Sequence, residues 1–292
     1  MPGVCNKWSM RRARVDVLIL VIIAIIGAPA LGFGQWLKYP TDGVPRTADG
    51  KPDMNAPTPR LPNGKPDFSG LWHASNPNRC PGAGGSQFIE CGTEIGGSAL
   101  GGNLGRNLQG GLPYQPHAAK LAQARRADDS RDDPHVRCLP DNPPRAWTLP
   151  HLTKIMQTPK QLALLYEVNA MYRQIFTDGR PFPEDPVPTW NGYSVGAWEG
   201  DTLVVRTQGF RDDLWIDTGG SPMSDVAKMT ERIRRPNFGT LDIELTIDDP
   251  KNYTKPFTVN LSQHFEMDTE LADEFCLENE KSYERMQRSR GK

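Results

Sequence analysis

Regular alternation of apolar and polar residues in the second half of the chain limits the folds that this sequence can adopt. In Thr240–Asp248 every second side chain is aliphatic, and the residues between them are polar or charged. Alternation with a period of two residues predicts a strand with one buried face and one solvated face. The clearest hairpin is segment 191–210, in which Glu199-Gly200-Asp201 provides a turn between two β-prone runs. These patterns predict a mainly β protein.

Further β-prone runs precede and follow this hairpin, and turn residues separate each run from the next. They lie at 153–158, 161–168, 171–176, 228–234 and 258–265. An antiparallel meander of this length must close or stack, because unpaired edge strands promote association with other chains. We expect a closed barrel, and a two-sheet β-sandwich is the alternative.

Two helices are expected beside the strands. Pro116–Ala127 has a proline at its first position and apolar residues at helical spacing. Segment 269–288 is amphipathic and predicts a C-terminal helix after the last strand. Residues 68–292 are therefore expected to form one domain, in which the glycine-rich segment 92–112 is a loop.

Residues 35–67 are rich in proline and glycine, and we expect an extended arm on the surface of the domain. The arm holds a short repeat, Asp49-Gly50-Lys51-Pro52-Asp53 and Asn63-Gly64-Lys65-Pro66-Asp67. Each copy begins with a dipeptide that favours a tight turn.

Residues 1–34 have the organisation of a secretory signal peptide. Basic residues precede an apolar run at 17–33, and Ala28-Pro29-Ala30 and Gly32-Phe33-Gly34 offer possible cleavage sites. The alternative is an uncleaved anchor in the inner membrane formed by residues 15–33, since such a run is just long enough to span a bilayer. In both cases the positive charges predict that the rest of the chain lies outside the cytoplasm, in the periplasm or beyond the cell.

The cysteines beyond this leader are even in number, as expected for disulfides in an oxidising compartment. They are Cys80, Cys91, Cys138 and Cys276. We expect a local pair, Cys80–Cys91, and a long-range pair, Cys138–Cys276. The sequence has no C-x-x-C motif and no histidine pair at helical spacing, so it predicts no metal site, and it indicates no cofactor.

The formal net charge of −1 gives no electrostatic basis for binding nucleic acid. Membrane contact is expected only through the N-terminal segment, if that segment is retained. A small-molecule ligand is the expected partner, and the sequence leaves the oligomeric state open.

Candidate site residues are polar side chains that share a strand face with apolar ones. Arg173 lies within run 171–176 and Glu231 within run 228–234. If these faces point inward, burial of either charge is costly unless it is paired. The two residues are therefore expected to pair with each other or to bind a polar ligand.

Other candidates come from aromatic and histidine side chains. Trp72, Trp190 and Trp215 are candidate ligand-binding aromatics, and Trp215 lies in an acidic loop with Asp212, Asp213 and Asp217. Tryptophan beside paired carboxylates suits sugar chemistry, and a solvated acidic loop is the alternative. His73 and His264 join Glu231 as candidate acid–base groups. His264 alternates with other polar residues, which predicts the solvated outer face or, alternatively, a polar lumen.

Several segments resemble known protein families. Gly70-Leu71-Trp72 opens the first strand and resembles the G-x-W signature of lipocalin-type barrels, in which the tryptophan closes one end. This resemblance implies that the expected barrel is of the calycin or lipocalin type. Segments 132–140, 173–180, 192–210, 230–235 and 246–256 resemble a family of exported bacterial proteins of uncharacterised function. That resemblance implies an exported, barrel-like domain and brings no catalytic residues with it.

These observations predict an exported barrel that binds a small, partly hydrophobic ligand in an internal cavity. One alternative is a cell-envelope enzyme, a hydrolase or isomerase, that uses Glu231, Arg173 and a histidine in the same cavity. Another is a surface structural or interaction protein. Whether the protein catalyses a reaction is left open by the sequence.

Overall fold

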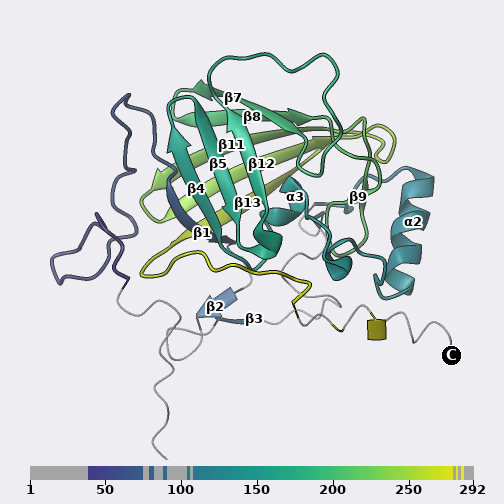
Figure 1. Ribbon diagram of the computed structural model, residues 1–292, viewed down its shortest axis with the longest axis horizontal. Helices are drawn as coiled ribbons and strands as arrows, with labels where there is room; N and C mark the ends of the chain where they lie inside the picture. Colours follow the sequence, from purple (N-terminus) through teal and green to yellow (C-terminus); the bar gives the residue numbers. More distant parts are fainter. Residues whose placement is uncertain are drawn as a thin grey trace, which may run out of the picture. The chain divides into compact units, whose positions relative to one another are not determined.

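Nine strands close into a barrel, which confirms the barrel prediction over the sandwich (Figure 1). Around the barrel they run in the order β1, β13, β12, β11, β8, β7, β6, β5 and β4, and β4 pairs with β1 again. The strands are β1 (Gly70–Ala74), β4 (Thr153–Thr158), β5 (Gln161–Tyr166), β6 (Tyr172–Phe176), β7 (Tyr193–Glu199), β8 (Thr202–Gln208), β11 (Lys228–Asn237), β12 (Thr240–Asp248) and β13 (Phe257–Glu266). Neighbours are antiparallel except β6 and β7, which pair in parallel through two residue pairs.

The computed structural model describes residues 39–74, 104–105, 108–278, 281 and 284–285, and the backbone alone at 79–81 and 88–90. All of these except residue 39 belong to one compact unit, residues 40–292. No helix among them is long and apolar enough to cross a membrane. The leader, residues 1–34, lies outside the described residues, as does most of the predicted loop 92–112.

A segment of the chain itself fills part of the barrel. Helix α3 (Pro143–Ala146) begins after Asn142, whose side chain accepts a hydrogen bond from the backbone N–H of Arg145. Residues 141–147 are all buried, and Trp147 is only 1% exposed. We call residues 141–149 the plug (α3 in Figure 1). Eight aliphatic side chains of the barrel core that are at most 1% exposed are Leu162, Leu164, Ile175, Leu203, Val205, Leu241, Ile243 and Leu245.

Trp72 lies in the core near the β11–β12 turn. Its indole N–H donates to the carbonyl of Phe68 at 2.8 Å, and the Arg235 guanidinium lies 4.9 Å from its ring centroid. Arg235 is itself buried and donates to the carbonyls of Phe238 and Asp67. Burial lowers the pKa of Arg235 to about 10. Trp72 is therefore a packing residue of the barrel.

Helix α2 (Pro116–Ala127) has the bounds predicted from the sequence. The remaining elements are short. They are β2 (Arg79–Pro81), β3 (Phe88–Glu90), η1 (His135–Arg137), η2 (Val168–Ala170), β9 (Leu214–Trp215) and β10 (Pro222–Met223). Strands β9 and β10 pair with each other, so the acidic loop after β8 contains a small hairpin.

The predicted C-terminal helix at 269–288 is wrong for most of its described part. Residues 269–278 are non-helical, and only Glu284 and Arg285 are helical. Contacts to β4 and to the residue that follows η1 hold the segment in this form. Lys154 Nζ lies 2.5 Å from a carboxylate oxygen of Glu270, and Cys276 forms a disulfide with Cys138. The helix was predicted from the local amphipathic pattern alone, which carries no information on these tertiary contacts.

Candidate functional site

Arg173 and Glu231 form a buried ion pair inside the barrel. Arg173 Nη1 lies 2.9 Å from Glu231 Oε1, and Nη2 lies 2.5 Å from Oε2. Arg173 is 2% exposed and Glu231 is fully buried. The guanidinium also donates to the hydroxyls of Ser194 and Thr207, at 3.2 Å and 3.0 Å. The sequence predicted that Arg173 and Glu231 either pair with each other or bind a polar ligand, and the structure shows that they pair with each other.

The plug supplies a further partner for this pair. The Trp147 indole N–H donates to Glu231 Oε1 at 2.7 Å, and the Gln263 amide donates to the Trp147 carbonyl at 2.9 Å. Burial raises the pKa of nearby Tyr166 to about 12. Both carboxylate oxygens of Glu231 thus accept hydrogen bonds from the protein itself. The arrangement fixes the plug in the barrel and keeps Glu231 paired with Arg173 and away from solvent.

The two histidines proposed as acid–base candidates lie together on the outside of the barrel. His73 of β1 is opposite His264 of β13 in the strand register. His73 Nδ1 lies 3.9 Å from a carboxylate oxygen of Glu266. Desolvation lowers the pKa of His264, although the residue as a whole is exposed. Because Glu231 faces the interior, the structure does not bring these histidines to it.

Trp190 and Trp215, in contrast, line one surface cleft at an end of the barrel. We call it the Trp cleft. Its volume is about 330 Å³, and its lining residues are Asp132, Pro134, Arg137, Leu139, Trp190, Arg211, Asp212, Asp213 and Trp215. Trp190 is half-buried, and Trp215 is 4% exposed. Two of the three tryptophans proposed as ligand-binding residues are therefore brought together.

Backbone contacts place the cleft residues. Thr189 and Phe210 form a parallel bridge, and the N–H of Arg211 donates to the Thr189 carbonyl at 2.9 Å. This sets the Arg211 guanidinium 4.7 Å from the Trp190 ring centroid. The Asn142 amide donates to the Trp215 carbonyl at 2.7 Å, which ties the cleft to the base of the plug.

The charges in the cleft differ in how far the protein neutralises them. Arg125 of α2 stacks on Trp215 at 4.4 Å and pairs with Asp213 at 2.6 Å. Arg211 is exposed and its guanidinium lies over the Trp190 ring, and among the described residues it forms no ion pair or side-chain hydrogen bond. Asp212 is likewise exposed and forms no hydrogen bond or ion pair within the described part of the chain. The remaining acid of this loop, Asp217, is buried and binds the Leu104 N–H and Ser221.

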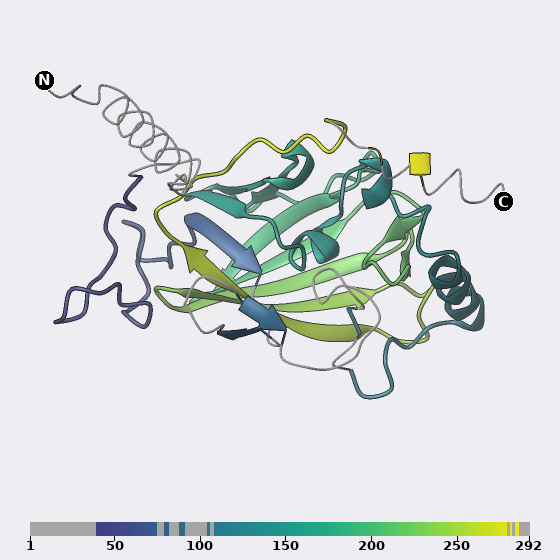
Figure 2. The same cartoon turned by 90° about the horizontal axis from the view of Figure 1, so that it is seen from below.

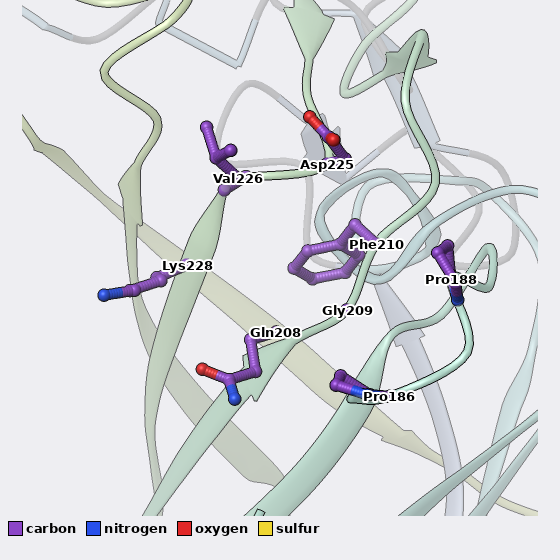
Figure 3. Close-up of a pocket in the computed structure, with 9 residues that line it drawn as sticks. Pro186, Pro188, Gln208, Gly209, Phe210, Asp225, Val226 and Lys228 are labelled. Carbon is purple, nitrogen blue, oxygen red and sulfur yellow. The ribbon is translucent and has the colours of Figure 1, made fainter. Parts of the chain in front are cut away.

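A second depression, which we call the Pro shelf, shares the segments at 186–190 and 208–211 with the Trp cleft. Its volume is about 380 Å³, and it is lined by Pro186, Pro188, Gln208, Gly209, Phe210, Asp225, Val226, Ala227 and Lys228. Figure 3 shows the Phe210 ring with the two prolines on one side and Val226 on the other. Phe210 is fully buried. The shelf is apolar and open, and it places no cation against an aromatic ring.

A histidine–aspartate pair that the sequence did not single out lies in the segment that forms one wall of the Trp cleft. His135 Nδ1 is 2.9 Å from Asp141 Oδ2. This hydrogen bond raises the pKa of His135. Arg145 binds both oxygens of Asp133, at 2.6 Å and 2.8 Å, and its Nε lies 3.0 Å from Asp141 Oδ1. The sequence signal was the density of charged residues between the prolines of segment 132–145.

The long-range disulfide prediction is confirmed, because Cys138 and Cys276 are bonded. Cys91 lies outside the described residues, so the predicted Cys80–Cys91 pair stays a prediction. The described residues contain no group of three or more histidine, cysteine, aspartate or glutamate side chains that could hold a metal ion.

No protein-family model and no curated protein matches the chain. The chemistry of the site therefore rests on the contacts of its own residues.

Proposed function

We propose that the protein is exported to the cell envelope and binds a small, partly hydrophobic anion in the Trp cleft. The observation that carries the proposal is the Arg211 guanidinium, exposed and stacked on Trp190 at the cleft wall. The interior positions first expected to bind a ligand, Arg173 and Glu231, are paired with each other, and Glu231 also accepts from Trp147. The proposed site is therefore at the barrel end.

The residues of the cleft define the ligand by their chemistry. An arginine held against an aromatic ring offers its N–H donors in a fixed plane, which suits a carboxylate or a similar planar anion. The half-buried Trp190 side chain offers apolar surface for a ring or a short hydrocarbon chain. Asp212 is free to accept a hydrogen bond from a hydroxyl or amine of the ligand. A cleft of about 330 Å³ is at the small end of ligand sites.

Two features support export. The Cys138–Cys276 disulfide is typical of proteins outside the cytoplasm. The leader at residues 1–34 has basic residues followed by an apolar run and small residues, the pattern of a signal peptide.

The binding proposal is tested with 2-naphthoate and its neutral amide, 2-naphthamide, as matched probes of charge. Tryptophan fluorescence of the full chain should show that naphthoate binds more tightly than naphthamide by roughly fivefold or more. Arg211→Gln should remove this preference, and Trp190→Leu should weaken the binding of both probes.

Arg206→Gln is the control, because Arg206 also lies over an aromatic ring, Phe182, but is not part of the cleft. Equal affinity for the two probes, or an equal effect of the Arg206 and Arg211 variants, would contradict the proposal.

The His135–Asp141 pair favours a second candidate function, a cell-envelope enzyme that uses His135 as its acid–base group. A carboxylate that accepts from Nδ1 fixes the imidazole ring and leaves Nε2 for proton transfer. The His135 side chain is 31% exposed, so solvent reaches it.

The test of this second candidate function is hydrolysis of naphthoate esters by the full chain. His135→Asn should abolish turnover and Arg206→Gln should retain it, and the absence of turnover above the uncatalysed rate excludes ester hydrolysis.

A further inference from the structure

The N-terminal arm contains two copies of one hairpin. The repeat extends upstream of the turn, so that both copies follow the pattern Pro-Arg-x-x-(Asp/Asn)-Gly-Lys-Pro-Asp, at residues 45–53 and 59–67. In each copy the arginine and the second proline form an isolated antiparallel bridge. The glycine of each turn has a positive φ, +82° at Gly50 and +78° at Gly64, which explains why glycine is retained there.

The arginine has the same internal contact in both copies. Arg46 Nη1 donates to the Gly50 carbonyl and Arg60 Nη1 to the Gly64 carbonyl, each at 2.8 Å. This hydrogen bond holds the guanidinium over the turn. It uses one N–H of Nη1, so the second N–H of Nη1 and those of Nη2 remain for a further partner. Each hairpin therefore presents an arginine and a lysine from the same positions of the repeat, Arg46 and Lys51 in the first copy and Arg60 and Lys65 in the second.

The second hairpin, residues 59–67, binds the turn between β7 and β8. Arg60 contacts both carboxylate oxygens of Asp201, at 2.9 Å and 2.6 Å. Lys65 Nζ donates to the Gly200 carbonyl at 3.3 Å and lies 5.8 Å from the ring centroid of Trp198. The hairpin thus recognises an acidic β-turn by its carboxylate, one backbone carbonyl and an aromatic ring.

The first hairpin, residues 45–53, makes no such contact. Residues 46–52 are all exposed, whereas Lys65 and Pro66 of the second copy are half-buried and buried. Within the described chain Arg46 has only its bond to Gly50. Lys51 is paired locally with Asp49 at 2.8 Å, with 79% of its side chain exposed. In Figures 1 and 2 this part of the arm, coloured purple, extends away from the barrel.

We propose that the first hairpin is a docking surface for an acidic β-turn of a partner protein, of the form aromatic-x-Gly-Asp. Arg46 binds the aspartate carboxylate through two parallel N–H···O bonds. Lys51 leaves Asp49 for the glycine carbonyl and the aromatic face, as Lys65 does in the second hairpin. The chain has one turn of this form, Trp198–Asp201, and the second hairpin already covers it. The turn that binds the first hairpin is therefore supplied by the partner protein.

The probe is a backbone-cyclised peptide with the sequence of residues 196–204, which contains the recognised turn. Its binding to the full chain is measured by calorimetry. Arg46→Ala and Lys51→Ala together should weaken binding by roughly fivefold or more, and so should an asparagine in place of aspartate in the peptide. Arg46→Lys should also weaken binding, because an ammonium cannot form the bidentate pair.

Arg234→Ala is the matched control, since Arg234 is an exposed arginine whose ion pair with Asp242 lies elsewhere on the barrel. It should leave binding unchanged. Loss of binding in Arg60→Ala but not in the Arg46 variants would overturn the proposal, because the peptide would then occupy only the second hairpin. Undetectable binding to the wild type would also overturn it. So would self-association of the chain that depends on Arg46, since a second copy would then be the occupant.

Discussion

At the scale of single residues, the Arg173–Glu231 pair and Trp147 depend on one another. Glu231→Gln leaves the Arg173 charge buried without its carboxylate, and removal of one partner of such a pair costs about 3–5 kcal/mol. We expect this loss in the free energy of unfolding, measured by urea denaturation with fluorescence and circular dichroism as probes. The Trp147 indole keeps an acceptor in the glutamine oxygen, so the loss reports chiefly on the charge.

The double variant Arg173→Met/Glu231→Leu is the control for this prediction. It removes both charges and fills the space with apolar side chains, which is often neutral or stabilising relative to a buried ion pair. The double variant should be more stable than Glu231→Gln. If Glu231→Gln is as stable as the wild type, the pair does not hold the plug.

His135 gives a prediction on pH. Its hydrogen bond to Asp141 raises its pKa in the folded protein above the ordinary value of 6.5. A raised pKa stabilises the fold fully below the unfolded pKa, and this stabilisation is lost as the pH rises through the folded pKa. From pH 5.5 to 8.5 the wild type should therefore lose more unfolding free energy than His135→Asn. His264→Asn is the control. The pKa of His264 is lowered, so this residue opposes the loss of stability with rising pH, and its removal should leave a loss at least as large as that of the wild type.

At the scale of elements, the C-terminal segment 267–278 acts as a strap on the barrel. It is tied down by the Cys138–Cys276 bond, which closes a loop over a sequence separation of 138 residues. The loop-entropy model gives about 5 kcal/mol as the upper estimate for this bond. Cys276→Ser should lower the unfolding free energy by up to that amount. Cys138→Ser and the double variant should show the same loss rather than twice the loss, because all three remove one cross-link.

The elements also show which parts of the fold can be predicted from sequence. The strands were predictable because each buries one face, and burial of one face leaves a period of two in the chain. The plug was not, because α3 has only four residues and its proline-rich sequence is typical of a bend. Likewise Trp190 and Trp215 stand out individually, but the contact that joins them passes through the Thr189–Phe210 bridge, which no local pattern encodes. The prediction of a C-terminal helix was wrong for the opposite reason. Its local pattern is typical of a helix, but the tertiary contacts of the segment hold it in a non-helical form.

At the scale of the whole molecule, the proposed export makes a prediction about the mature chain. Protein recovered from the envelope of a bacterial host should have lost residues up to about 30 or 34, as judged by intact mass. Cys138 and Cys276 should not react with iodoacetamide until a reductant is added. A full-length chain in the membrane fraction would instead identify residues 15–33 as an anchor, and free thiols at both cysteines would contradict export.

The strand count of the barrel has one more consequence. In a closed ring of strands, directions can alternate throughout only if the number is even, so nine strands require one parallel seam. That seam is β6–β7, with only two paired positions, Ile175–Ser194 and Phe176–Val195, whereas β12 and β13 share eight. Local opening follows the weakest pairing. Amide hydrogen exchange should therefore be fastest, among barrel strands, at β6 and the start of β7, and the ring should part there before it unfolds.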